Sequence, residues 1–198
     1  MTKLLYQGHA SFRLISSEGM VCYIDPFAGE GYDKEADLVF ITHEHYDHNA
    51  IDKVTMKDNC VSIRSKDALN QGIYRTFAEK GFKIKAVPAY NSHHPKGFGV
   101  GYVIEVDGIK VYHSGDTDFI PEMKDLEGEK IDYALLPIDG FYTMTPEDAD
   151  KAADVIKPKH FIPMHMKPGM DFVMSQAMKV HSPHAMLMRP GDEIVLEK

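Results

Sequence analysis

The sequence is short of three features that mark particular classes of protein: cysteine pairs, long apolar runs and positive charge. Its two cysteines, Cys22 and Cys60, are too few for a disulfide framework, and neither belongs to a C-x-x-C pair. No apolar run approaches the roughly 18 residues that a membrane-spanning helix needs. The formal net charge of −8 argues against a nucleic-acid-binding surface. We therefore expect no disulfide framework, no membrane partner and no nucleic-acid partner.

The amino-terminal segment, residues 1–14, has positive charge and a short apolar patch, but polar residues and a glycine interrupt it. It is too short and too polar for the apolar region of a secretory signal, so we interpret it as β-strand and expect a cytoplasmic protein. A length of 198 residues suits one compact domain, and no linker-like segment divides the chain. We therefore predict a single domain over residues 1–198.

Short apolar segments bounded by turn residues predict a protein rich in β-strands. The predicted strands are residues 3–8, 11–16, 20–25, 37–42, 60–64, 82–89, 99–108, 109–116, 133–138 and 159–165. Asp107-Gly108 joins two of these segments and is the strongest hairpin signal in the sequence. The last residues, 185–197, also have a hairpin-like pattern.

Helices are fewer and concentrate late in the chain. We expect a helical stretch that ends at Gly81, and a helix that begins after Thr145, where proline and acidic residues follow an N-cap threonine. A third helix is expected from about Asp171 to Lys179, where methionines recurring every four residues would pack in the core or contact another copy in a homo-oligomer. Strands with interspersed helices predict an α/β (α+β) protein with two packed sheets and helices outside them.

The segment HEHYDH, residues 43–48, is the most informative part of the sequence. It directly follows an apolar strand, so the rigid end of a strand would position its side chains. Alternate residues of an extended segment point the same way, so His43 and His45 can bind one ion together. If the chain then turns into a helix, Asp47 and His48 reach a second position nearby. By composition, H-x-H-x-D-H is expected only about 0.003 times per chain.

Three further residues of ligand type follow apolar strands elsewhere in the chain: His94, Asp116 and His165. Taken singly, each is more often an ordinary hydrogen-bonded polar residue than a metal ligand. Together with residues 43–48 they place ligand types at four strand ends, which predicts a metal site at one edge of the sheets. Imidazole and carboxylate ligands suit zinc and its first-row neighbours.

Taken together, these motifs resemble those of the metallo-β-lactamase superfamily. The matching segments are GHASF, IDPF, HEHYDH, PAYN-x-x-H-PKG, YHSGDTD, FYTMTPEDA and PMH. They cover nearly the whole chain in the expected order, and they most resemble the small metal-dependent hydrolases related to ascorbate-6-phosphate lactonase. The resemblance implies a four-layer αββα sandwich with the metal ions at one edge of the sheets.

The resemblance also implies a two-metal site. One ion would be held by His43, His45 and His94, and the other by Asp47, His48 and His165. Asp116 would bridge the two ions. We expect zinc, with manganese or iron as alternatives. His94 is preferred over the adjacent His93 only because it matches the family's H-PKG pattern, and His93 is expected to be exposed.

Such a site would activate water to cleave a small, anionic ester, lactone or phosphodiester, with Asp47 orienting the water and accepting its proton. Thioester hydrolysis is an alternative because it uses the same nucleophile. A non-hydrolytic di-iron redox or metal-binding protein is another, since the same ligands bind iron. The absence of a flavin- or haem-binding segment counts against the redox alternative.

Several neighbouring residues are candidates for supporting roles. Asp25 could accept the N–H of a metal-bound histidine, or it could simply end a strand in an Asp-Pro turn. The resemblance places His9 near the site, and we expect His9 and Tyr142 to bind substrate, although Tyr142 could equally serve in packing. Asp139 stands where the family pattern predicts a small residue, which could alter the wall of the pocket. His113 could support the site or be buried and hydrogen-bonded elsewhere.

Overall fold

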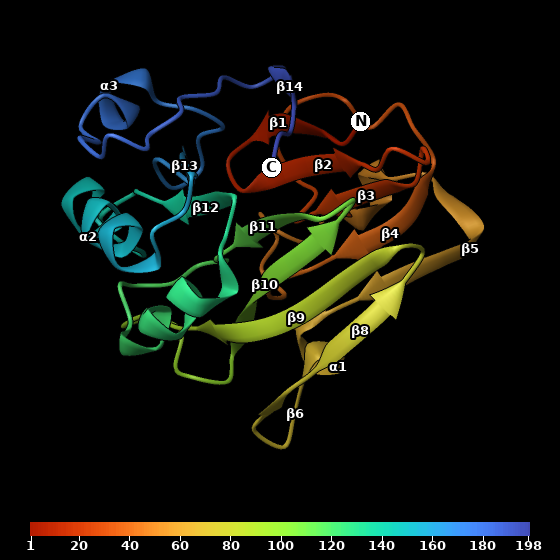
Figure 1. The fold of residues 1–198 in the computed structure, drawn as a ribbon, viewed down its shortest axis with the longest axis horizontal. Coiled ribbons are helices and arrows are strands. Elements are labelled where there is room, and N and C mark those ends of the chain that lie inside the picture. The colour runs from red at the N-terminus through yellow and green to blue at the C-terminus, as the bar shows by residue number, and fades with distance from the viewer.

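Two six-stranded mixed β-sheets pack face to face in the computed structural model, which describes residues 1–198 (Figure 1). The first sheet has the spatial order β14 (Glu193–Val195), β1 (Lys3–Gly8), β2 (Ser11–Ile15), β3 (Val21–Ile24), β4 (Ala36–Phe40) and β5 (Met56–Ile63). The second sheet has the order β13 (His160–Met164), β12 (Tyr133–Pro137), β11 (Ile109–His113), β10 (Gly99–Val106), β9 (Phe82–Ala89) and β8 (Thr76–Glu79).

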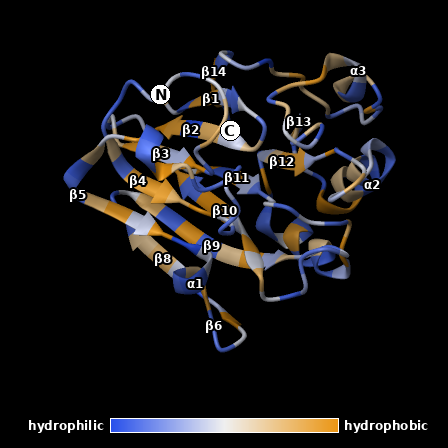
Figure 2. Ribbon diagram, turned by 180° about the vertical axis from the view of Figure 1, so that it is seen from behind, coloured by the Kyte–Doolittle hydropathy of each residue, from blue (hydrophilic) through white to orange (hydrophobic).

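Alternating side chains on the strands build the core between the two sheets. In β9, Phe82, Ile84 and Ala86 are buried in this core, whereas Lys83 and Lys85 point outward. Figure 2 shows hydrophobic residues concentrated in the strands and mainly hydrophilic residues in the connecting loops. Because successive side chains of a strand point to opposite faces, each sheet turns its apolar face toward the other.

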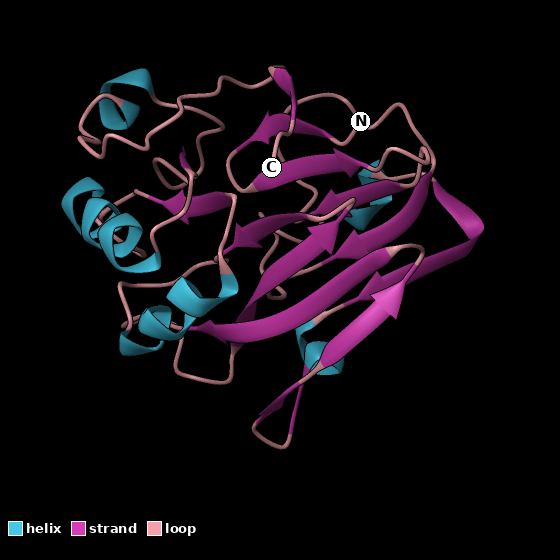
Figure 3. Cartoon of the chain, viewed as in Figure 1, coloured by secondary structure: helices cyan, strands magenta, loops and turns pink.

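Helices cover the outer face of the second sheet. The helix α2 (Pro146–Ile156) buries Ala149, Ala152 and Ile156 along one face and packs with η2 (Pro121–Glu129) on this sheet (Figure 3). That spacing is the apolar stripe of an amphipathic helix. The predicted helix start is also confirmed, since the Thr145 hydroxyl accepts a hydrogen bond from the Asp148 N–H at 3.1 Å.

The outer face of the first sheet has a thinner cover. The short turn η1 (Ile51–Lys53) and the adjacent Val54 pack over Tyr23 and Val39 of the strands. The predicted αββα sandwich is thus confirmed, with few helical residues in this layer. None of the helices combines the length and the apolar character needed to cross a bilayer.

The prediction of a helical stretch ending at Gly81 is wrong. After α1 (Ser65–Ala68), the chain forms the small hairpin of β6 (Leu69–Asn70) and β7 (Ile73–Tyr74) and then the edge strand β8. Lys80 and Gly81 both have positive φ, 50° and 84°, and they connect β8 to β9 in a hairpin. Gly81 therefore serves a two-residue hairpin turn rather than a helix end.

The carboxyl-terminal predictions are also partly wrong. The helix expected at residues 171–179 is limited to α3 (Met174–Ala177), so its methionines do not share a long helical face. Residues 185–197 form no hairpin; β14 pairs instead with β1, joining Val195 to Lys3. Leu196 N donates to Thr2 O at 2.9 Å, so the two ends of the chain lie side by side (Figure 1). The free edge of β1 provides this pairing, which no local pattern encodes.

Candidate metal centre

The carboxyl ends of strands from both sheets meet at one edge of the sandwich. In the second sheet β11, β12 and β13 are parallel, and in the first sheet β3 and β4 are parallel, so within each sheet these strand ends share one edge. The Val100 N–H donates to Thr42 O at 3.0 Å and ties the two edges together. Each predicted ligand lies in a loop that leaves one of the strands β4, β9, β11 and β13.

The first ligand group contains His43, His45 and His94. One ring nitrogen from each lies within 4.8 Å of those of the other two. His43 and His94 are buried, and His45 is partly exposed. These are the three residues that the family resemblance assigns to one metal ion.

The second ligand group contains Asp47, His48 and His165, together with His9. One ligand atom from each of the four lies within 4.8 Å of the others. The His9 Nε2 is 3.3 Å from Asp47 Oδ2, and the His9 ring lies against the ring of His165 with centroids 3.9 Å apart. The predicted second set therefore converges, with one additional histidine.

The carboxylate of Asp116 lies between the two groups. Its oxygens are 3.8 Å from the Nε2 of His43, 3.3 Å from that of His48 and 3.4 Å from that of His165. These three buried nitrogens make no hydrogen bond. Protein interiors rarely leave such atoms without a partner. Unpaired imidazole nitrogens around a carboxylate are instead the donor set that divalent cations bind, so these residues fit a metal centre.

Asp25 holds His48 in place from the side opposite Asp116. Its Oδ2 is 2.7 Å from His48 Nδ1, which leaves Nε2 facing the centre. The same carboxylate accepts hydrogen bonds from the backbone N–H of Thr42 at 2.7 Å and from its hydroxyl at 2.6 Å. Asp25 has a left-handed backbone with φ of 46°, which turns its side chain out of the end of β3. The arrangement matches the role expected for Asp25 more closely than a simple strand-ending turn does.

Asp139 has a contact with a predicted ligand that the sequence interpretation did not anticipate. The sequence suggested only that Asp139 could alter the pocket wall; in the structure its Oδ2 lies 2.9 Å from His165 Nδ1. Its carboxylate also accepts hydrogen bonds from the N–H groups of Phe141 and Tyr142, at 2.6 and 2.7 Å. The Asp139 carboxylate thus lies beside His165 Nδ1 as that of Asp25 lies beside His48 Nδ1, but only the Asp25 contact has the geometry of a hydrogen bond. The position of Asp139 directly after an apolar strand, like Asp25, is the signal that could have identified it.

Asn91 also escaped the sequence interpretation as an individual residue. Its Oδ1 accepts the N–H of His94 at 2.8 Å, and its Nδ2 donates to the backbone oxygen of Asp116 at 3.1 Å. It therefore links the loops that carry two predicted ligands. The motif PAYN contained this residue, but only the tertiary structure gives its partners.

His9 lies outside its expected role, and His113 takes one of the two roles that the sequence left open. His9 was predicted to bind substrate, yet its side chain is fully buried and does not line the cavity. It contacts Asp47 on one side and the Met170 carbonyl oxygen, at 3.3 Å, on the other. His113 is buried and hydrogen-bonded, with Nε2 donating to Ala10 O at 2.9 Å. His113 is therefore a structural residue behind the loop that carries Asp116.

The ligand groups open into a cavity of about 460 Å³. Its lining combines the ligand side chains with Tyr46, His93, Phe98, Tyr142, Pro168 and Gly169. Tyr142 thus lies where a substrate contact was predicted, and His93 is exposed as expected. The cavity is of a size that suits a small molecule.

The buried charges make the centre attractive to cations. Burial would raise the pKa of Asp116, but His165 and His48 hold it well below its usual range. Burial would lower the pKa of His165, but Asp116 raises it to about 9, and the pKa of His48 is likewise raised. In His43, by contrast, burial lowers the pKa to about 3, which leaves a neutral imidazole. The negative charge of Asp116 therefore stabilises positive charge in the site, whether on a protonated histidine or on a bound cation.

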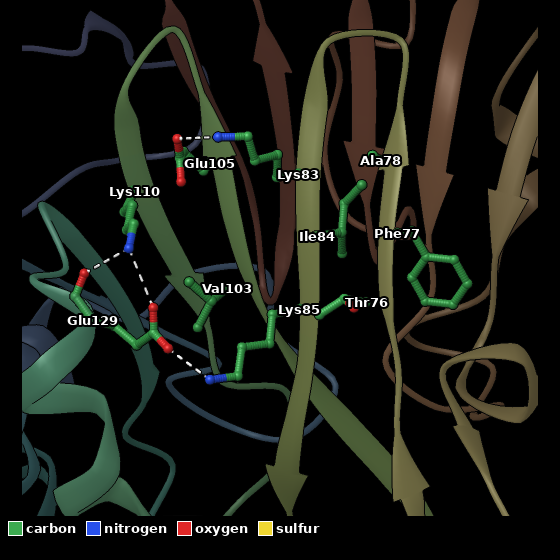
Figure 4. Close-up of a pocket in the computed structure, with 10 residues that line it drawn as sticks. All are labelled: Thr76, Phe77, Ala78, Lys83, Ile84, Lys85, Val103, Glu105, Lys110 and Glu129. Carbon is green, nitrogen blue, oxygen red and sulfur yellow. Dashed lines mark hydrogen bonds and ion pairs between the residues drawn. The ribbon is translucent and has the colours of Figure 1, made fainter.

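A second hollow lies on the outer face of the second sheet, away from these ligands (Figure 4). Its charged residues are already paired: Lys83 with Glu105 at 3.0 Å, and Lys85 and Lys110 with Glu129 at 2.6 and 3.2 Å. It contains no unpaired buried donor or nucleophile. We therefore place the functional site at the histidine-lined cavity, although the outer hollow is also well formed.

Comparison with known proteins agrees with the fold and the site. Residues 3–165 match the model of a β-lactamase superfamily domain. The chain is 36% identical over 193 residues to a UPF0173 metal-dependent hydrolase of Thermococcus onnurineus, covering 83% of this chain and 84% of the relative. It is 33% identical to one of Thermococcus kodakarensis in an alignment that covers 99% of this chain and 100% of the relative.

A solved structure extends the similarity to three dimensions. Igni18, a metallo hydrolase from Ignicoccus hospitalis, superposes with a TM-score of 0.74 at 27% identity, covering 100% of this chain and 99% of that one. The predicted membership is thus confirmed by the family model, by sequence and by fold. The chain belongs to the metallo-β-lactamase superfamily and is a metal-dependent hydrolase of the UPF0173 group.

Proposed function

We propose that this hydrolase works with two divalent ions, zinc being the best match to the ligands, and cleaves a small anionic ester, lactone or phosphodiester. One ion would be held by His43, His45 and His94, the other by Asp47, His48 and His165, with Asp116 shared. The observation that carries the proposal is the convergence of three unpaired Nε2 atoms on the Asp116 carboxylate.

When bound, such ions supply a Lewis acid for the substrate oxygen and lower the pKa of water toward neutrality. The protein's own residues fix the geometry for this chemistry. Asp25 accepts a hydrogen bond from His48 Nδ1, and the Asp139 carboxylate lies at ion-pair distance, 2.9 Å, from His165 Nδ1, so both rings keep Nε2 toward the centre. Because these partners are themselves hydrogen-bonded to backbone, the ligand positions are preorganised.

Asp47 is the residue we assign to proton transfer. Its side chain is only partly buried and lines the cavity, so it reaches the space a substrate would occupy. Burial would raise its pKa, but the hydrogen bond with His9 and the nearby His48 hold that pKa below its usual range. Asp47 therefore stays ionised and can accept the hydrogen bond that orients the attacking water. Because its low pKa makes it a weak base, it would take the proton only if bound ions acidify that water.

The charge of the site favours an anionic substrate. The positive charge of two divalent ions would exceed the negative charge of the two carboxylates facing them, Asp47 and Asp116, although Asp25 and Asp139 lie behind the ligands and the whole chain is acidic. No lysine or arginine lines the cavity. Attraction of an anion would therefore depend on the ions themselves.

The proposal is tested by elemental analysis of protein purified without chelator or nickel, combined with a screen of lactones, esters, thioesters and phosphodiesters. We expect close to two zinc or manganese ions per chain and hydrolysis that stops on metal removal. His45→Ala and Asp116→Ala should lose metal and at least about a hundredfold in activity, while circular dichroism stays unchanged. His181→Ala, at an exposed position, is the matched control and should behave like the unaltered protein.

The alternatives give different results in the same experiment. Cleavage restricted to thioesters would replace the proposed substrate class and keep the mechanism. Iron without hydrolysis would favour the redox alternative. Activity retained by a metal-free Asp116→Ala variant would exclude the proposed mechanism.

A further inference from the structure

The wall of the cavity beyond the metal ligands is aromatic and uncharged. Tyr46, Phe98 and Tyr142 line it and are 72%, 42% and 38% exposed. The only carboxylates in the lining are Asp47 and Asp116, both of which the proposed metal centre uses. A substrate with a second anionic group distant from the scissile bond would find no lysine or arginine in the lining to pair with it.

The three rings come from separate loops. Tyr46 belongs to the HEHYDH loop after β4, and its ring meets that of Phe27 edge-on at 5.8 Å. Phe98 precedes β10 and stacks on His94 at 4.8 Å with an interplanar angle of 17°. The aromatic surface is thus directly continuous with a predicted ligand.

Tyr142 forms a further part of the same lining. Its ring meets the ring of His93 edge-on at 5.0 Å, and that of Phe141 at 4.6 Å. The backbone N–H of Tyr142 donates to Asp139, which in turn contacts His165. Tyr142 is therefore anchored to the same support as a ligand, and its position is set relative to the metal centre.

Aromatic side chains that stay solvent-exposed in a cavity offer apolar surface that a flat ligand group can bury. Stacked or edge-to-face ring pairs add to the binding free energy beyond this burial. We propose that the substrate carries an aromatic ring next to its scissile anionic group, and that this ring packs against Phe98 and Tyr142. The inference rests on the proposed hydrolase function and narrows its substrate class. It favours aryl-substituted esters, lactones or phosphodiesters over polyanionic sugar phosphates.

The test compares three phosphonates that bind metal but are not hydrolysed: methylphosphonate, cyclohexylphosphonate and phenylphosphonate. Their dissociation constants are measured by calorimetry on zinc-loaded protein. We expect phenylphosphonate to bind about tenfold more tightly than methylphosphonate and more tightly than cyclohexylphosphonate, which controls for size. In Phe98→Leu and Tyr142→Leu, the preference for phenyl over cyclohexyl should fall about three- to tenfold.

Phe77→Leu is the matched control, because Phe77 lines the outer hollow of Figure 4 and not this cavity. It should keep the phenyl preference. Equal affinity for all three phosphonates would overturn the aromatic proposal and leave the metal centre standing. If zinc fails to bind and no phosphonate binds, the proposed function fails and this inference fails with it.

Discussion

His9, Asp25 and His165 are non-glycine residues with left-handed backbone, at φ values of 51°, 46° and 43°. Such conformations cost of order 1–3 kcal/mol and persist only where surrounding bonds enforce them. Here the enforcing bonds are visible: Asp25 N donates to Phe40 O, and His165 N donates to His9 O. All three residues lie where a strand ends at the metal centre, so the backbone strain serves to aim side chains.

The Asp25 to His48 contact gives a prediction at this scale. Asp25→Asn should weaken metal binding about 10- to 100-fold, because the amide cannot hold the His48 tautomer as the carboxylate does. Competition with a chromophoric chelator measures the affinity, and circular dichroism checks the fold. Asp58→Asn, on an exposed position of β5, is the control and should bind metal normally. An unchanged metal affinity in Asp25→Asn would contradict the proposed role of Asp25 in orienting His48.

Metal uptake should also depend on pH. Asp116 raises the pKa of His165 to about 9, so in metal-free protein this imidazole is protonated at pH 7, and the pKa of His48 is raised in the same direction. Ligation needs neutral imidazole, so binding must release the His165 proton, and affinity should increase between pH 7 and 9 by about tenfold per pH unit for this proton. Calorimetry in buffers of different ionisation enthalpy counts the protons; a count of zero would contradict the expectation.

Individual residues differ in how well the sequence predicted their positions. The ligand types could be identified because HEHYDH is rare and because the other candidates follow apolar strands. The partners of Asp139 and His9 could not, since each contact joins segments far apart in the chain. A local sequence pattern predicts which residue lies at a strand end, whereas the tertiary packing determines which side chains that residue contacts.

At the scale of elements, β10 contains two glycines where a central strand would normally carry larger side chains. A Cβ on Gly101 would lie 3.0 Å from the backbone oxygens of His113 and Ser114, and one on Gly99 would lie 3.1 Å from His43 Cβ. The glycines therefore let β10 approach the loops that carry His43 and Asp116. The close approach of these elements is part of what brings the ligand loops together.

Gly101→Ala should destabilise the protein by about 1–3 kcal/mol, because the clash is with backbone that cannot rotate away. Urea unfolding followed by circular dichroism measures the change. Gly128→Ala, in η2, is the control: a Cβ there meets nothing within 4 Å, and we expect a change below about 0.5 kcal/mol. Equal stability of both variants would show that β10 has room to move.

Elements with strong local signals were predicted correctly, and those that depend on pairing were not. The Asp107-Gly108 hairpin and the helix after Thr145 follow from turn and capping residues. The turn residues Lys80 and Gly81 pair β8 with β9, but the sequence interpretation took Gly81 as a helix end. The edge strand β14 lacks a local signal and forms because an edge of β1 offers unpaired backbone groups, which is a property of the assembled sheet.

At the scale of the whole molecule, the proposed ions would bridge loops from both sheets. Binding at a hundredfold excess over Kd would stabilise the fold by about 2.7 kcal/mol, so chelation should lower the Tm by about 5–10 °C. The apo-protein should stay folded, because the core between the sheets does not depend on the ligands. Calorimetric scans with and without chelator test both points. His45→Ala should show a much smaller metal-dependent shift.

The overall architecture was predictable from the resemblance of motifs in order along the chain, and only weakly from strand patterns alone. Alternating and continuous apolar segments indicate strands, yet they do not say which strands share a sheet. The division into two sheets follows from long-range pairings such as β1 with β14.

The two chain ends lie next to each other on the first sheet, at the Lys3 end of β1. The other end of β1, at Gly8, leads into His9 and the metal centre. How the chain is connected at the Lys3 end of β1 is thus independent of the metal centre. A circular permutant that joins Lys198 to Met1 by a short flexible linker and opens the chain at the exposed turn around Gly19 would keep every strand and every ligand. The order of the motifs along the chain would then change while the arrangement of the ligands in space stayed the same.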